Sequence, residues 1–233
     1  MARRLYRQRS DARLERFAPY RWVSTALRRL GLPAHYKRRF RPKFDDLEAE
    51  ITYLLIRHRR PAAILEVAPY YAWSTTWLLQ AVRDNGSGQV HSYDLVDYSR
   101  RTVPPDLARG RWSFTRGDIR EHVGRLPRGI GYLFLDAAHT AEFAAWYVRE
   151  VLPRLPAGTL VGVHDIFRGA APPMPESAVL LDWLRDRGIA CFTAAAGHPG
   201  GAYDSLMTVK RELGLAEPIH DSVKNPMAFF RLP

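Results

Sequence analysis

The sequence predicts an α/β fold: a doubly wound, mostly parallel, seven-stranded Rossmann-like sheet preceded by an N-terminal helical arm. From residue 61 onward, short apolar runs alternate with helical segments, as in parallel sheets that helices cover on both faces. An acidic residue also stands at or just after five consecutive runs, where such a sheet binds its ligand. No repeat of about 20 to 50 residues is present, which excludes a solenoid.

Each strand is expected where a short apolar run is bounded by turn or charged residues. The seven expected strands are 62–67, 90–94, 112–115, 131–136, 160–164, 190–194 and 228–232. Helices are expected where apolar residues recur every three or four positions. They are 44–58, 74–83, 105–109, 119–125, 141–152 and 176–187. Right-handed crossovers then bring the carboxyl ends of the parallel strands, and the ligand site, to one edge of the sheet.

The chain divides into a basic helical arm, residues 1–43, and a Rossmann-like domain, residues 44–233. Residues 1–60 contain 17 Lys+Arg and 6 Asp+Glu, a net charge of +11, so the rest of the chain is neutral overall. Clustered arginines could face an anionic partner such as nucleic acid, an acidic membrane surface or a phosphorylated substrate. A solvated helical face is the favoured interpretation. Apolar residues at helical spacing in 23–30 predict packing on the main domain or on a second subunit of a homodimer.

Composition excludes several protein classes. An apolar content of 46% excludes a collagen-like or wholly disordered chain. No apolar run approaches the roughly 18 to 20 residues that span a bilayer, and no apolar segment follows the basic N-terminus, so a cytoplasmic protein is expected. The single cysteine, Cys191, excludes an internal disulfide and a cysteine zinc cluster. A metal would therefore need oxygen and imidazole ligands.

The first strand-to-helix turn, residues 66–75, reads EVAPYYAWST. It contains neither the Gly-x-Gly-x-x-Gly of dinucleotide sites nor the Gly-Lys-Ser/Thr of P-loops, whose backbone amides bind phosphates. This favours a cofactor without phosphates. Carboxylates bind an ammonium group, ribose hydroxyls and an adenine amine, and S-adenosylmethionine offers all three.

The sequence resembles the class I S-adenosylmethionine-dependent methyltransferases, in particular the small-molecule and sugar O-methyltransferases. Their turn reads Glu-(Ile/Val)-Gly-x-x-x-Gly-x-Ser-Thr, so Ala68 and Ala72 replace both glycines here. The resemblance covers roughly residues 44–233 and is strongest in FLDAAH and VHDIF. An alanine at positive φ costs on the order of 1 kcal/mol, and Pro69 is expected to hold Ala68 extended. A rebuilt, working pocket is favoured over one that has lost the cofactor.

The resemblance implies roles for residues along the strand ends. Glu66 and the turn to Ser74 would hold the methionine portion of the cofactor, Asp94 the ribose hydroxyls and Asp118 the adenine amine. The implied cofactor site comprises Glu66, Ala68, Tyr70, Trp73, Ser74, Asp94, Asp118, Ile119 and Asp136.

A metal site is expected after the fourth and fifth strands. A hydroxyl acceptor is a weak acid, and a divalent cation such as Mg²⁺ lowers its pKa and fixes its position. The resembling enzymes place a metal-binding carboxylate and a histidine base in Asp-x-x-His, which Asp136 and His139 match. Asp136 and Asp165 are expected as metal ligands with His164 as a third. Asp136 and His139 are the expected catalytic residues, with His139 as the general base.

Three functions compete at this point. The first is a metal-assisted O-methyltransferase acting on a small polar metabolite or a sugar. The second is an RNA methyltransferase that uses the Arg-rich arm for phosphate contacts, although the sequence has no recognisable RNA-binding module. The third is a cofactor-binding protein without turnover, prompted by the two alanines in the glycine positions.

Overall fold

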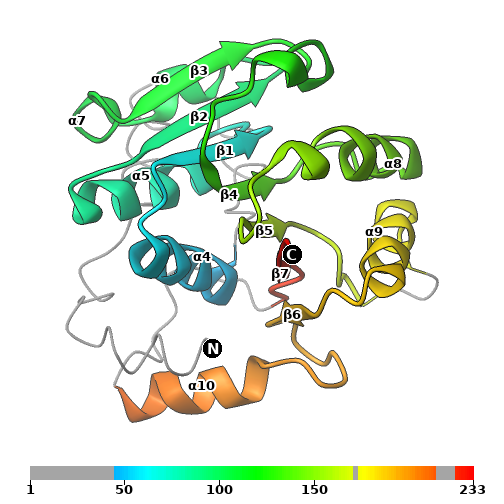
Figure 1. Ribbon diagram of the computed structural model, residues 1–233. Coiled ribbons are helices and arrows are strands. Elements are labelled where there is room, and N and C mark those ends of the chain that lie inside the picture. The colour runs from blue at the N-terminus through cyan, green and yellow to red at the C-terminus, as the bar shows by residue number, and fades with distance from the viewer. Residues whose placement is uncertain (1–44, 170–172, 214–223) are drawn as a thin grey trace, which may run out of the picture.

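The computed structural model describes residues 45–169, 173–213 and 224–233 (Figure 1). The basic arm, on which the predictions of an anionic partner and a homodimer rest, lies outside the described residues. The described chain forms one seven-stranded sheet of order β3-β2-β1-β4-β5-β7-β6. Strands β1 to β5 are parallel, and β7 runs antiparallel to both β5 and β6. The strands are β1 Ala63–Val67, β2 Gln89–Asp94, β3 Trp112–Arg116, β4 Ile130–Leu135, β5 Leu160–Val163, β6 Cys191–Thr193 and β7 Ala228–Arg231. The predicted Rossmann-like sheet is confirmed.

The longer helices cover both faces of the sheet (Figure 1). They are α4 Asp46–Arg59, α5 Trp73–Asn85, α8 Ala141–Glu150, α9 Pro175–Asp186 and α10 Tyr203–Glu212, with the short α6 Ser99–Thr102 and α7 Pro105–Ala108. Along β4, Tyr132 and Phe134 pack in the cluster that contains α4 and α5. Leu133 and Leu135 pack on the other face, in the cluster that contains α8 and α9. Because side chains alternate along a strand, both faces of β4 are buried.

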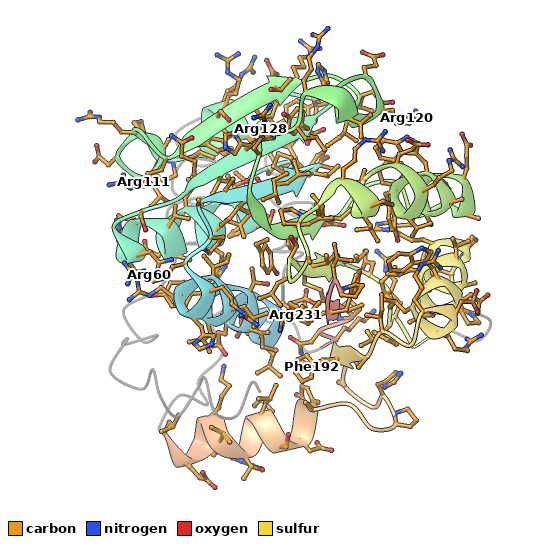
Figure 2. The ribbon with its side chains drawn as sticks, viewed as in Figure 1. Arg60, Arg111, Arg120, Arg128, Phe192 and Arg231 are labelled. Atoms are coloured by element: carbon orange, nitrogen blue, oxygen red, sulfur yellow. The ribbon has the colours of Figure 1, made fainter. Side chains whose placement is uncertain are left out.

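Side chains fill the layers between the sheet and its helices (Figure 2). None of the helices in the described ranges meets the length and apolarity needed to cross a membrane.

The elements differ from the predicted ones in three places. Strand and helix ends shift by at most two residues, but the segment 119–125 forms two 3₁₀ turns, Ile119–Glu121 and Val123–Arg125, instead of one helix. Helices α6 and α10 were not predicted. In α10 the buried residues Leu206, Val209 and Lys210 recur at helical spacing, a pattern that was present in the sequence. The Lys210 ammonium lies 2.7 Å from a carboxylate oxygen of Glu50 on α4, a contact that periodicity does not show.

Candidate active site

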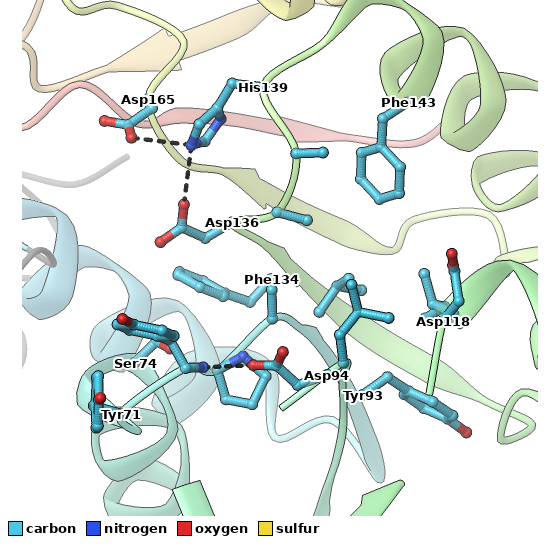
Figure 3. A pocket seen from close by; sticks show the side chains of 18 of the residues that line it. Tyr71, Ser74, Tyr93, Asp94, Asp118, Phe134, Asp136, His139, Phe143 and Asp165 are labelled. Atoms are coloured by element: carbon cyan, nitrogen blue, oxygen red, sulfur yellow. Dashed lines mark hydrogen bonds and ion pairs between the residues drawn. The ribbon is translucent and has the colours of Figure 1, made fainter. Parts of the chain in front are cut away.

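A cavity of about 520 Å³ opens at the carboxyl ends of β1 to β5. This is where the ligand site of a doubly wound sheet is expected, beside the reversal of strand order at β1 and β4. Its volume lies in the range of small-molecule sites. Of the expected site residues, it is lined by Ala68, Tyr70, Trp73, Ser74, Asp94, Asp118, Ile119, Asp136, His139 and Asp165. Figure 3 shows most of these side chains converging from separate strands.

The first turn adopts a backbone that is unusual for its residues. Ala68, Tyr70 and Ala72 have φ values of 62°, 49° and 69°, in the left-handed region that favours glycine. The expectation that Pro69 keeps Ala68 extended is therefore wrong. Hydrogen bonds hold the turn instead: the Ala68 N–H donates to Tyr93 O at 2.8 Å, and the Tyr70 N–H donates to Asp94 Oδ2 at 2.8 Å.

Replacing Ala68 with glycine is expected to stabilise the protein. The substitution removes left-handed strain of about 1 to 2 kcal/mol, while the greater freedom of glycine in the unfolded chain offsets about 0.4 to 1 kcal/mol. A net gain near 0.5 kcal/mol would raise the melting temperature by roughly 1 to 2 °C, measurable by calorimetry. Ala178, exposed in the interior of α9, is the matched control because glycine there should destabilise. A lower melting temperature for Ala68→Gly would contradict the strain argument.

Glu66 does not contact the cavity. Its side chain is fully buried, and its oxygens accept hydrogen bonds from Ser74 at 2.7 Å, Thr75 at 2.9 Å and Ser92 at 2.5 Å. Burial raises the pKa of Glu66 to about 7. The expectation of direct cofactor contact is thus corrected: Glu66 can act only through Ser74, which does line the cavity.

Two carboxylates lie where the resemblance places the nucleoside. Asp94 accepts the N–H groups of Tyr70 and Val96, and partial burial raises its pKa. Asp118 Oδ2 accepts from the Arg120 guanidinium at 2.6 Å, and this contact lowers the pKa of Asp118. Arg120 extends to the surface (Figure 2). Each carboxylate has further lone pairs, since an ionised carboxylate offers about four acceptor positions.

At the other end of the cavity, an imidazole and two carboxylates converge. His139 Nε2 lies 3.4 Å from Asp165 Oδ2 and 3.7 Å from Asp136 Oδ1 (Figure 3). One ligand atom from each of these three residues lies within 4.8 Å of the others. Two carboxylate oxygens with one imidazole suit Mg²⁺ or Mn²⁺. The donor set therefore fits a divalent cation.

His164 lies against the same two carboxylates from the buried side. It is 4% exposed and does not line the cavity. Its Nε2 lies 2.8 Å from Glu48 Oε1, and its Nδ1 lies 3.3 Å from both Asp136 Oδ1 and Asp165 Oδ2. Burial lowers the pKa of His164, but the charges of Asp136 and Glu48 outweigh burial and raise that pKa well above its usual value. His164 as the third metal ligand stays a prediction, and His139 is a further nitrogen beside the same two carboxylates.

Sequence reasoning missed several side chains around this cluster. Arg168 contacts Asp165 and lines the cavity. Glu176, on α9, lies 2.7 Å from His139 Nδ1. For Glu48, one available signal was its place three residues after Asp45, which is the spacing of a capping box. Glu176 offered no comparable signal.

Comparisons with known proteins agree with this architecture. A family model described as a methyltransferase domain matches residues 69–166. No curated protein sequence matches the chain significantly.

Solved structures of the same fold include an O-methyltransferase from Bacillus cereus in complex with SAH, with 13% identity, TM-score 0.61, and coverage of 97% of this chain and 96% of that one. The O-methyltransferase TomG from Streptomyces achromogenes, in complex with SAM, has 14% identity, TM-score 0.59 and coverage of 92% and 89%. SAH-bound Podospora anserina methyltransferase PaMTH1 has 15% identity, TM-score 0.58 and coverage of 85% of each chain.

The fold and the matched domain both agree with the resemblance to methyltransferases. The matched segment begins in the left-handed first turn and ends after β5, so it contains the acidic residues that line both ends of the cavity. The match of residues 69–166 confirms the resemblance of this chain to methyltransferases, and solved O-methyltransferases with SAM or SAH bound share its fold.

Proposed function

We propose that this protein is an S-adenosylmethionine-dependent O-methyltransferase that acts, with a divalent cation, on a hydroxyl group of a small polar metabolite or sugar. One observation supports this most: a single cavity holds Asp94 and Asp118 at one end and the cluster of Asp136, His139 and Asp165 at the other. The first end matches a nucleoside, and the second matches a hydroxyl to be deprotonated.

The donor end would bind the cofactor through groups that the structure leaves facing the cavity. Asp94 accepts hydrogen bonds from the ribose hydroxyls, and Asp118 accepts one from the adenine amine. Ser74 and the backbone of the turn from Ala68 contact the methionine portion. Structures of similar fold have SAM or SAH bound, which supports this choice of donor.

At the acceptor end, His139 Nε2 takes the hydroxyl proton while the oxygen bonds to the methyl group and the methyl–sulfur bond of the sulfonium breaks, leaving S-adenosylhomocysteine. Asp136 and Asp165, with His164 as the expected third ligand, would hold Mg²⁺ or Mn²⁺, which would lower the pKa of the hydroxyl. The cavity walls align the acceptor oxygen with the methyl group and exclude water, which is the main contribution that an enzyme makes to an in-line displacement.

The alternatives differ in what the structure offers them. The Arg-rich arm that an RNA methyltransferase would use lies outside the described residues. A cofactor-binding protein without turnover was prompted by Ala68 and Ala72, yet both alanines adopt the left-handed backbone that favours glycine, and the cavity remains open. This observation favours a working pocket.

Calorimetry with SAM, with and without Mg²⁺, tests the proposal. Wild type should bind SAM in both conditions. Asp94→Ala should weaken SAM binding by about 10- to 100-fold, because hydrogen bonds to a charged group contribute about 1.5 to 3 kcal/mol. Asp106, exposed on α7 and outside the cavity, is the control: Asp106→Ala should bind as wild type does.

Absence of SAM binding to wild type would overturn the proposed donor. Equal affinity of wild type and Asp94→Ala would overturn the role of Asp94. Turnover is then measured with methyl-labelled SAM and a panel of sugars and polyols, and a chelator should abolish turnover without abolishing SAM binding.

A further inference from the structure

The strongest unexplained feature is a buried carboxylate behind the site. The Glu176 side chain, in the first turn of α9, is 2% exposed and does not line the cavity. Its Oε2 lies 2.7 Å from His139 Nδ1, and the structure records no other ion pair of Glu176 among the described residues. A buried carboxylate is costly unless it is paired, so a contact this short indicates a specific task.

The surroundings of Glu176 limit what else it can do. Tyr147, on α8, is fully buried, and its burial together with the negative charge of Glu176 raises the pKa of the phenol. Tyr147 therefore stays a neutral neighbour. It also packs edge-on against Phe143, which lines the cavity. The packing of α8 on α9 thus fixes Glu176 in position behind the imidazole.

The hydrogen bond decides which tautomer His139 adopts. An ionised carboxylate only accepts hydrogen bonds, so the Nδ1 atom of a neutral His139 must carry the hydrogen and donate to Glu176. Nε2 then presents a lone pair to the cavity, where it faces oxygens of Asp136 and Asp165. Without Glu176, the ring could instead donate Nε2–H to either aspartate and lose that lone pair.

We propose that Glu176 is a positioning residue that holds His139 in the Nδ1–H tautomer and so keeps the Nε2 lone pair directed at Asp136 and Asp165. The consequence for catalysis rests on the proposed function, since that lone pair takes the hydroxyl proton there. The tautomer itself is a property of the folded protein and is independent of that function.

Nitrogen-15 NMR of the histidine rings tests the proposal in the full chain at about pH 8.5, where an ordinary imidazole is neutral. His139→Gln identifies the signals of His139 by their loss. Wild type should show the Nδ1–H tautomer at His139. Glu176→Ala should shift it toward Nε2–H, whereas Glu176→Gln, whose amide oxygen can still accept the hydrogen bond, should largely restore the wild-type pattern.

Mn²⁺ affinity gives a second reading, because a ring that donates Nε2–H to Asp136 or Asp165 competes for the oxygens that would hold the ion. Glu176→Ala should weaken Mn²⁺ binding by about 10- to 100-fold, the range for residues that orient the groups around a metal, with SAM affinity unchanged. The matched control is Glu50→Gln, which removes another buried carboxylate, paired with Lys210 outside the cavity. It should lower thermal stability but leave the His139 tautomer and Mn²⁺ affinity as they are.

Two results would overturn the proposal. One is an Nε2–H tautomer at His139 in wild type, a result that does not depend on the folding of any variant. The other is a Glu176→Ala protein with the wild-type tautomer and unchanged Mn²⁺ affinity. If wild type binds neither SAM nor Mn²⁺, the proposed function fails, and the NMR comparison still decides the role of Glu176.

Discussion

Replacing His139 with alanine is expected to lower the turnover of methyl transfer by about 10²- to 10⁴-fold, the range that a positioned general base contributes. SAM affinity should not change, because His139 lies at the end of the cavity opposite Asp94 and Asp118. The measurement combines turnover with methyl-labelled SAM, at saturating Mg²⁺, with calorimetric SAM binding.

His91→Ala is the matched control for this experiment. His91 lies on β2, contacts Ser113 at 2.8 Å and does not line the cavity. Turnover of this variant should stay close to wild type. A His139→Ala protein that retains turnover, or that loses SAM affinity with unchanged turnover, would contradict the assignment of His139.

Replacing Asp165 with asparagine is expected to weaken Mn²⁺ binding by on the order of 100-fold or more, because a charged oxygen ligand is lost from a set of three. The substitution suits the backbone: Asp165 has φ 62°, and asparagine tolerates the left-handed region. Electron paramagnetic resonance of free Mn²⁺ measures the affinity, and SAM binding should be retained.

The control is Asp182→Asn, which removes an exposed carboxylate that pairs with Arg185 on α9. Its Mn²⁺ affinity should match wild type. If Asp165→Asn bound Mn²⁺ as tightly as wild type, the cluster with Asp136 and His139 would not be the metal site.

The acids of the site were predictable because a topological rule governs them. The carboxyl ends of parallel strands meet at one edge, so Asp94, Asp118, Asp136 and Asp165 were expected together, and all four line the cavity. The rule uses only the order of elements. The same order, in which short apolar runs alternate with helical segments, also predicted the mostly parallel sheet.

The partners of those acids were not predictable, because distant elements supply them. His164 contacts Glu48 across 116 residues of sequence, and His139 contacts Glu176 across 37. The strand-end rule placed His164 beside Asp165 but could not show that Glu48 holds its ring. The backbone of Ala68 was mispredicted for a similar reason, since hydrogen bonds from neighbouring strands outweighed the local preference before Pro69.

One carboxylate joins three separate parts of the fold. Glu48 accepts hydrogen bonds from the Asp45 N–H at the start of α4 and from the Met227 N–H just before β7, and it also contacts His164 after β5. A rigid shift of α4 would therefore displace the His164 imidazole, which lies beside Asp136 and Asp165. The position of that imidazole is thus coupled to a helix whose residues 46–56 are all buried, so a change in the packing of α4 would reach this end of the cavity.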